Sequence, residues 1–203
     1  MVRIVVASGN RGKINDFKAI FPYDEIVGIK ELLPDFEVEE TENSFEGNAI
    51  LKAEAASDAL KLPVISDDSG LSVLALDGAP GVYSARFAGA EATDEENNEK
   101  LLRALGGETD RRAYFTSVIA FALPNRETRT YRGELHGEIL NSPQGEAGFG
   151  YDPLFKTNDG TYLGMINAEE KGKISHRRNA LENMRQDTVV YELLVRDERN
   201  DSY

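Results

Sequence analysis

Two adjacent carboxylates, Asp67 and Asp68, stand between two apolar runs of the sequence. Val64 and Ile65 precede them, and the run 71–76 follows after a serine and a glycine. Carboxylates lower the propensity of a chain for strand, so a pair at this place needs a reason. At the end of a strand, one aspartate could face a cleft and hold a hard cation such as Mg²⁺. An ordinary polar turn explains the same residues and is the simpler interpretation when they are considered alone.

A second candidate site is the segment 8–13, which follows a strand-like run and precedes a helical pattern. A turn between a strand and a helix can present backbone N–H groups and a helix N-terminus to an anion. Lys13 would add a mobile cation there. The segment matches neither the P-loop nor the dinucleotide-binding fingerprint, and a plain strand-to-helix turn remains the alternative.

Two later stretches could recognise a nucleotide. The stretch 148–155 is rich in glycines and aromatic residues, which let the backbone approach a ligand and offer faces for stacking on a base. The alternative is that these aromatic residues pack beneath a loop. The segment 171–178 is basic, and its alternative is a solvated helix end. Its cations are Lys171, Lys173, His176, Arg177 and Arg178.

The composition restricts the class of protein. The chain has 203 residues, 40% hydrophobic and 29% charged, which is typical of a soluble globular protein. A net charge of −13 opposes general binding to nucleic acid or to an anionic membrane. There is no apolar run of membrane-spanning length, no signal-peptide layout at the first residues, and no cysteine for disulfides or thiolate metal sites. We expect a cytoplasmic protein with no nucleic-acid or membrane partner.

Hydrophobic periodicity and capping residues predict alternating strands and helices. Strands are expected at 3–7, 25–29, 64 to the two aspartates, 113–123 and 128–140, with the last two paired as a hairpin. Helices are expected from the segment 8–13 to Pro22, from a capping box of Asn43 and Glu46 to Leu60, and from Thr93 to Leu105. Shorter helices are expected after Asn167 and Ser175, and both strand and helix remain open for 188–195.

Four segments, in this order, resemble the inosine triphosphate pyrophosphatase family, also described as dITP/XTP pyrophosphatases. They are 8–13 (SGNRGK), 66–71 (SDDSGL), 149–153 (FGYDP) and 175–177 (SHR). The segments 45–53 (FEGNAILKA) and 78–87 (GAPGVYSARF) are similar to further segments of the family. Each motif alone is weakly specific, but their common order and spacing over residues 2–182 are highly specific.

The resemblance implies one α/β domain over residues 1–203, with a long mixed central sheet and flanking helices that form two lobes around an active-site cleft. It implies a homodimer that hydrolyses the α–β phosphate bond of the deaminated purine nucleoside triphosphates ITP, dITP and XTP. The products would be the monophosphate and pyrophosphate, the cofactor Mg²⁺, and the role cleansing of the nucleotide pool. The tail beyond residue 182 matches poorly, which leaves dimer contacts there open.

The resemblance also implies the site residues. Asp68 would be the proton acceptor and, together with Glu40, the metal ligand, although the adjacent Glu39 remains an alternative to Glu40. Asp67 has no assigned role and could be structural or hold a second cation. The residues expected to bind substrate are Ser8, Gly9, Asn10, Arg11, Gly12, Lys13, Ser69, Phe149, Gly150, Tyr151, Asp152, Lys171, His176 and Arg177.

These residues suit the implied chemistry. Lys13, Lys171 and Arg177 could offset the repulsion between an anionic protein and a triphosphate. Mg²⁺ would neutralise charge on the phosphates, and Asp68 would orient or deprotonate water for in-line attack at the α-phosphorus. Donors such as His176 suit the 6-keto oxygen of hypoxanthine or xanthine and would reject the amino group of adenine.

Two other functions remain open. A non-catalytic nucleotide-binding module would need the cations of the site but not Glu40 and Asp68. A pyrophosphatase for other modified nucleotides is the second alternative, against which the FGYDP and SHR segments argue. Analysis of the products formed from ITP, dITP, XTP, GTP and ATP distinguishes these two functions from the purine triphosphate pyrophosphatase that the resemblance implies.

Overall fold

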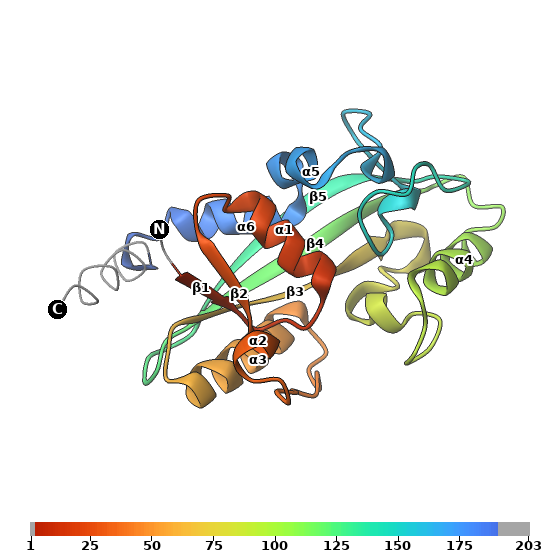
Figure 1. The fold of residues 1–203 in the computed structure, drawn as a ribbon. Helices are drawn as coiled ribbons and strands as arrows, with labels where there is room; N and C mark the ends of the chain where they lie inside the picture. Colours follow the sequence, from red (N-terminus) through yellow and green to blue (C-terminus); the bar gives the residue numbers. More distant parts are fainter. Residues whose placement is uncertain (1–2, 191–203) are drawn as a thin grey trace. The chain divides into compact units, whose positions relative to one another are not determined.

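A six-stranded sheet forms the centre of the fold in the computed structural model, which describes residues 3–190 (Figure 1). The strand order is β2-β1-β3-β4-β5-β6. Strand β1 is parallel to β2 and β3, whereas β5 and β6 are antiparallel, so the sheet is mixed. The predicted α/β class with a mixed sheet is therefore confirmed. The strands are β1 (Arg3–Val6), β2 (Glu25–Gly28), β3 (Val64–Val73), β4 (Arg112–Ala122), β5 (Arg129–Ile139) and β6 (Phe155–Thr157).

The helices begin where the sequence supplies capping side chains. Thr93 and Glu96 form a capping box at the start of α4, and Asn167 and Glu170 form another at α5, as predicted. The α-helices are α1 (Arg11–Ile20), α2 (Ile29–Leu32), α3 (Phe45–Leu60), α4 (Asp94–Ala104), α5 (Ala168–Ile174) and α6 (His176–Arg185). Short 3₁₀ turns are η1 (Leu74–Leu76), η2 (Gly81–Arg86), η3 (Asp152–Leu154) and η4 (Leu163–Met165).

The chain divides into two compact units. Unit 1 comprises the residues up to Asp68, 117–133, and those from Arg177 onward. Unit 2 comprises 69–116 and 134–176. Strands β3, β4 and β5 contribute one part to each unit. The active-site cleft implied by the resemblance stays a prediction.

In unit 1 the sheet is covered on both faces, because alternate residues of a strand point to opposite sides. Ile4 and Val6 of β1 belong to a core cluster with Phe17 of α1 and Leu181 of α6, and these helices lie side by side in Figure 1 although they are far apart in sequence. Residues Val5 and Ala7 face the other way, into a cluster with α2 and α3. This double cover explains why β1 reads as a continuous apolar run.

Unit 2 has its own core, built where β3 ends and β4 begins. Leu71 and Val73 of β3 pack in one cluster with Leu101 and Leu105 of α4. Tyr151 joins the same cluster, so the predicted base-binding segment is anchored in this core.

Two sequence predictions are wrong in detail, and a question that the sequence left open is answered in part. Strand β3 does not end at the two aspartates but runs through them to Val73, because cations and Ser117, described below, bind the Asp67 carboxylate and one oxygen of Asp68 inside the sheet. Helix α3 is capped by Ser44, one residue after the predicted Asn43, and the Ser44 side chain accepts a hydrogen bond from the N–H of Gly47. In the tail 188–195, for which strand and helix both remained open, residues 188–190 are helical, and the rest lies outside the described residues.

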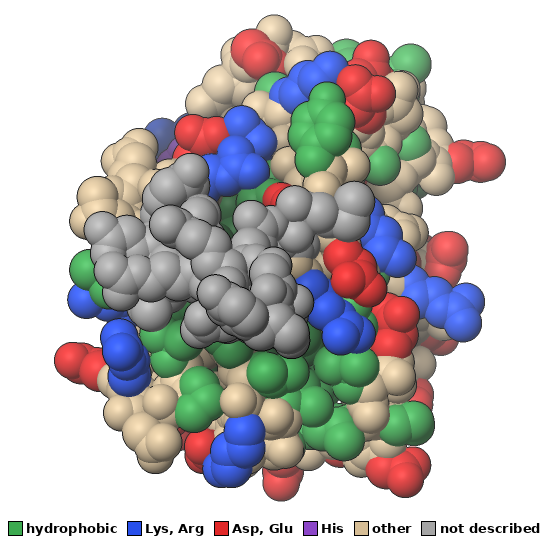
Figure 2. Space-filling view, turned by 60° about the vertical axis from the view of Figure 1, so that its left-hand side comes forward, with side chains coloured by type: hydrophobic (Ala, Val, Ile, Leu, Met, Phe, Trp, Pro, Cys, Tyr) green, Lys and Arg blue, Asp and Glu red, His purple; other side chains and the backbone are tan. Residues whose placement is uncertain are grey.

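Charges of both signs are mixed on one face of the protein. Figure 2 shows Lys and Arg side chains interspersed with Asp and Glu, so the described part of this face carries no continuous basic field. Across residues 3–190, no helix combines the length and the apolar character that crossing a bilayer requires.

Candidate active site

The candidate site in unit 1 lies where strand β1 ends beside β3. Strand β1 pairs with β3 as far as Ile65, whose carbonyl accepts a hydrogen bond from the N–H of Ala7. Beyond Ala7 the chain turns into the segment 8–13, and the carbonyl of Asp67 lies two residues beyond Ile65 on β3. It accepts hydrogen bonds from the Nζ atoms of Lys13 at 3.3 Å and Lys52 at 3.0 Å. Two ammonium groups are thereby gathered at one backbone oxygen.

The side chain of Asp67 is a buried anchor for cations. It is fully buried, and its carboxylate lies 2.9 Å from Lys13 Nζ and 3.1 Å from an Nη atom of Arg177. Ser117 of β4 donates a further hydrogen bond of 2.5 Å. Burial alone would raise the pKa of Asp67, but the charges of Arg177 and Lys13 outweigh it and hold this pKa well below its usual range. Of the two roles left open by the sequence, these contacts favour the structural one.

Arg177 lies inside the protein rather than at the surface. Its side chain is completely buried, and its guanidinium pairs with Asp16 of α1 at 2.5 Å as well as with Asp67. Arginine is suited to this position because its planar fork can bridge two carboxylates. In this structure Arg177 fixes α1 and β3 to the start of α6, and the predicted contact with substrate stays a prediction.

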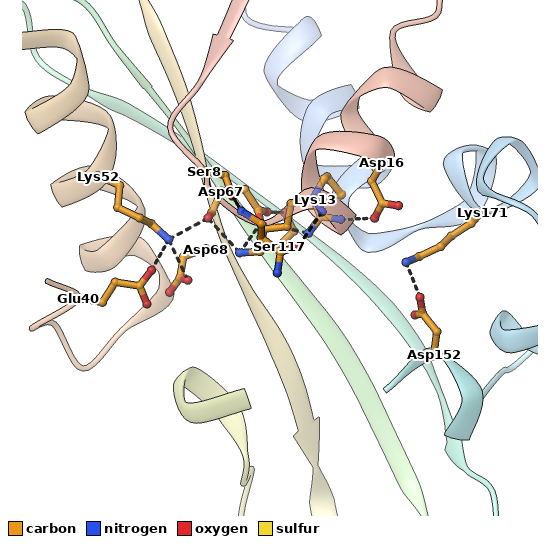
Figure 3. A network of polar contacts seen from close by, with 12 residues as sticks. Ser8, Lys13, Asp16, Glu40, Lys52, Asp67, Asp68, Ser117, Asp152 and Lys171 are labelled. Atoms are coloured by element: carbon orange, nitrogen blue, oxygen red, sulfur yellow. Dashed lines mark hydrogen bonds and ion pairs between the residues drawn. The ribbon is translucent and has the colours of Figure 1, made fainter. Parts of the chain in front are cut away.

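Asp68 faces a different set of groups. Figure 3 shows Lys52 of α3 pointing between Asp68 and Glu40, with its Nζ 3.3 Å from the Asp68 carboxylate and 2.6 Å from that of Glu40. Burial raises the pKa of Asp68, and although Lys52 and Lys13 oppose this effect, the pKa remains above its usual value. The neighbouring aspartates therefore have pKa shifts in opposite directions, as expected of two carboxylates with different environments.

The start of α3 positions Glu40 and Lys52. Asn48 is fully buried, and its side-chain amide both accepts from the N–H and donates to the carbonyl of Glu42, which holds the segment just after Glu40. Lys52 lies one helical turn beyond Asn48 on α3. Glu39 is exposed, so the geometry favours Glu40 over Glu39 as the acidic partner of Asp68.

The segment 8–13 forms the predicted turn between β1 and α1. Asn10 is the N-cap of α1, and its side-chain oxygen accepts a hydrogen bond from the N–H of Lys13 at 3.1 Å. Ser8 Oγ accepts another from the N–H of Asn10 at 3.2 Å. Gly9, Asn10 and Arg11 are exposed, as a loop that meets a ligand requires.

The predicted base-binding residues gather in unit 2. Asp152 Oδ2 accepts a hydrogen bond from the N–H of Phe149 at 3.0 Å and pairs with the buried Lys171 at 2.6 Å, a pair also drawn in Figure 3. Lys171 Nζ lies 4.5 Å from the centre of the Phe149 ring, a cation–π contact that covers one ring face. Asp152 and Lys171 therefore set the position and orientation of the Phe149 ring.

The remaining predicted residues of unit 2 are placed around this group. The Tyr151 hydroxyl donates to the carbonyl of Ser84 at 2.7 Å, and Ser84 Oγ accepts from the N–H of Leu71 on β3 at 2.8 Å. His176 is buried and stacks on Phe115, with ring centres 4.9 Å apart. Ser69 is half-buried, in contrast to its buried neighbours on β3.

The residues around Asp68 fit a hard cation with an incomplete protein ligand set. Asp68 Oδ2 is buried and accepts no hydrogen bond from any described residue. No cluster of three or more His, Cys, Asp or Glu suited to a metal is found among residues 3–190. Mg²⁺ commonly takes only one or two protein carboxylates and fills its octahedron with water and substrate phosphates. Glu40 and Asp68 match that pattern, and Lys52 already places one cation beside them.

Sequence reasoning missed Lys52, Asn48 and Asp16. A signal for the first two was present, because Asn48 and Lys52 stand four residues apart on α3 beside its apolar face of alanines. Buried polar residues at helical spacing indicate a specific partner. No comparable local signal marks Asp16, whose partner Arg177 is distant in sequence.

Replacement of Lys52 by Met should destabilise the protein by about 1.5–3 kcal/mol, the range for hydrogen bonds that involve a charged group. Methionine keeps the length of the side chain but leaves the carboxylates of Glu40 and Asp68 facing each other without a cation. Urea denaturation measures the change, and Lys18→Met, at an exposed position of α1, is the matched control. Equal stability of the two variants would contradict a structural role for Lys52.

The comparisons with known proteins agree with the sequence motifs. Residues 4–187 match the model of the Ham1 family. A dITP/XTP pyrophosphatase of Staphylococcus aureus (strain MW2) is 56% identical over 183 residues, which are 89% of this chain and 93% of the relative. A protein of the same name from Staphylococcus epidermidis (strain ATCC 12228 / FDA PCI 1200) is 53% identical over 182 residues, again 89% and 93% of the two chains.

Solved structures show the same fold. The Staphylococcus aureus Ham1 protein superposes with a TM-score of 0.80 at 54% identity, covering 91% of this chain and 96% of that one. A HAM1 protein from Coxiella burnetii gives a TM-score of 0.81 at 38% identity, covering 95% of this chain and 100% of that one. With the family model, the motifs and the fold in agreement, the chain belongs to the Ham1 family.

Proposed function

We propose that the protein hydrolyses the deaminated purine nucleoside triphosphates ITP, dITP and XTP to the monophosphate and pyrophosphate. The close relatives named dITP/XTP pyrophosphatase support this proposal, since they are more than half identical over most of the chain. The observation that carries it is the environment of Asp68, whose buried Oδ2 has no hydrogen-bond partner among the described residues and lies beside a cation-rich turn. A non-catalytic nucleotide-binding module would have no use for such a carboxylate.

The turn after β1 supports binding of the phosphate chain. Lys13 projects from the first turn of α1, and Asp67 holds its ammonium in place rather than leaving it to move in solvent. The exposed backbone of Gly9 and Asn10 lies next to this cation at the helix N-terminus. A fixed cation and a helix N-terminus act together on an anion, which suits a phosphate group on this loop.

Asp68 would then act on the attacking water. Its raised pKa makes it a stronger base than an ordinary aspartate, and its second oxygen accepts no hydrogen bond from a described residue. Asp68 would hold the water and take its proton as the oxygen attacks the α-phosphorus, with pyrophosphate as the leaving group. Lys52 keeps the adjacent Glu40 and Asp68 from repelling each other.

Glu40 and Asp68 would also hold Mg²⁺. When bound, this ion would supply positive charge to the phosphate oxygens and so lower the barrier to displacement. The ammonium of Lys52 lies between the two carboxylates, so the ion would share Glu40 and Asp68 with this cation.

Recognition of the purine would depend on unit 2. The Phe149 ring has Lys171 against one face, and a base would stack on the opposite one. A donor such as His176 would meet the 6-keto oxygen of hypoxanthine or xanthine, whereas the amino group of adenine would leave it unpaired. The hydrogen bond to the 6-keto oxygen would therefore favour ITP and XTP over ATP.

Product analysis tests the proposal. ITP, dITP, XTP, GTP and ATP are each incubated with the protein, with and without Mg²⁺, and pyrophosphate and orthophosphate are measured separately. We expect pyrophosphate from ITP, dITP and XTP, little from ATP, and little from any substrate without Mg²⁺. Stepwise release of orthophosphate, or binding without turnover, would refute the proposed activity.

Two further features belong to the same proposal. The protein would act as a homodimer and in the cytoplasm, where the nucleotide pool is. Light scattering of the purified protein tests the first, and a single-chain mass would contradict it.

A further inference from the structure

Gly150, at the centre of the base-binding segment 149–152, is held by two side chains of α4. Its N–H donates to Asp94 Oδ2 at 2.6 Å, and its carbonyl accepts from Asn98 Nδ2 at 3.0 Å. Asp94 and Asn98 are four residues apart, so they lie on one face of α4, one helical turn from each other. Both backbone groups of a single residue are thus bound by one helix face.

The contacts within the segment 149–152 stabilise its internal shape. Phe149 is bonded to Asp152 twice, through its N–H to the carboxylate and through its carbonyl to the N–H of Asp152. These two bonds close the segment on itself and set its internal shape. Gly150 has a φ of +60°, a conformation that glycine adopts without strain, and this turns its peptide groups outward toward α4. The bonds to α4 therefore act on where Gly150 and Phe149 lie rather than on the internal shape of the segment.

Apolar packing holds the residues that follow Gly150, since Tyr151 and Leu154 share a core cluster with Leu101 and Leu105 of α4. A cavity of about 530 Å³ is lined on one side by α4, through Asn98, Glu99 and Leu102, and on the other by the segment from Pro143 to Gly150. Since open space lies between α4 and the segment at Phe149 and Gly150, apolar side chains do not fill the gap at these two residues. The two side chains that bind Gly150 span this gap directly.

We propose that Asp94 and Asn98 are positioning residues for purine recognition, which they support by holding the Gly150 peptide groups and through them the Phe149 ring. The inference rests on the proposed function, because it assumes that the purine stacks on Phe149. Asp94 and Asn98 belong neither to the proposed phosphate-binding turn after β1 nor to the surroundings of Asp68. Their loss should therefore weaken binding of the base and leave the chemical step intact.

The expected result is a change in KM for nucleotide substrates. Asp94→Ala and Asn98→Ala should each raise KM for ITP and XTP about tenfold, the factor for one lost hydrogen bond with a charged or buried partner, while kcat changes little. Inorganic tripolyphosphate, which has no base, is the second probe. Its inhibition constant should be the same for both variants and the original protein, because the phosphate site lies on other residues.

Matched variants separate positioning from helix stability. Asp94→Asn retains an acceptor oxygen for the N–H of Gly150 and should restore most of the affinity for ITP. Glu95→Ala removes another exposed carboxylate from the first turn of α4, and it should have no effect on KM. Hydrogen exchange at the Gly150 amide, followed by NMR, should be faster in Asp94→Ala than in Glu95→Ala.

The outcomes distinguish this inference from the proposed function. If the original protein releases no pyrophosphate from ITP or XTP, the proposed function fails, and the exchange rate of the Gly150 amide still tests the contact. If the activity is present but KM is unchanged in Asp94→Ala and Asn98→Ala, the positioning role is overturned. A parallel rise in KM for ITP and in the inhibition constant of tripolyphosphate would also overturn it, since that would indicate a general loss of structure.

Discussion

Replacing Asp67 by Asn is expected to lower the free energy of unfolding by about 3–5 kcal/mol, the range for removal of one partner from a buried ion pair. The change leaves the ammonium of Lys13 and the buried guanidinium of Arg177 facing an uncharged amide. Asp16 would remain as the partner of Arg177 but could not balance both cations. Urea denaturation, with the midpoint and slope determined separately, measures the loss.

Asp110→Asn is the matched control for this prediction. Asp110 also pairs with an arginine, Arg112, at 2.7 Å, but both side chains are exposed. Exposed ion pairs contribute little to stability because water screens them, so no measurable change is expected. If Asp67→Asn were as stable as Asp110→Asn, the account of Asp67 as a buried anchor would be wrong.

Asp68→Asn is expected to abolish turnover while the protein stays folded. Loss of a general base lowers the rate by about 10²–10⁴-fold, and loss of a metal ligand would lower it further. Asparagine has nearly the same shape and can still accept a hydrogen bond from Lys52, so the fold should be retained. Pyrophosphate release from ITP gives kcat, and calorimetry with ITP gives the affinity, which should fall only modestly.

Asp58→Asn, at an exposed position of α3, serves as the control for Asp68. Its activity should equal that of the original protein. Activity of Asp68→Asn at the level of the control would remove Asp68 from the catalytic role. Inactivity together with an unfolded circular-dichroism spectrum would instead show that Asp68 is needed for the fold.

Much of the fold follows from local patterns in the sequence. Alternating apolar runs and capping residues such as Thr93 and Asn167 predicted strands β1–β5 and all α-helices except α2, because each depends on neighbours within a few residues, whereas the short elements α2, β6 and η1–η4 were missed. The prediction failed where a distant contact overrides local propensity. Strand β3 continues through Asp67 and Asp68 because Lys13, Lys52 and Ser117 satisfy groups that would otherwise end it.

Asp67 and Asp68 show most clearly which properties follow from the sequence and which depend on the folded structure. The sequence by itself determined the family motifs, and the resemblance that they carry implied a site at Asp68 with Glu40 or Glu39 and left Asp67 without a role. Which groups surround each carboxylate depends on β1 leaving the sheet at Ala7 and on α3 and α6 approaching β3 from different positions along the chain.

Tertiary structure alone decided the roles that depend on such distant contacts. Arg177, which a motif assigns to the substrate, is buried against Asp67, and Lys52 lies between Glu40 and Asp68. Asp94 and Asn98 reach a residue more than fifty positions away, and nothing near them in the sequence indicates that partner. A carboxylate becomes an anchor or a base through its burial and its charged neighbours, and these are set only when the chain is folded.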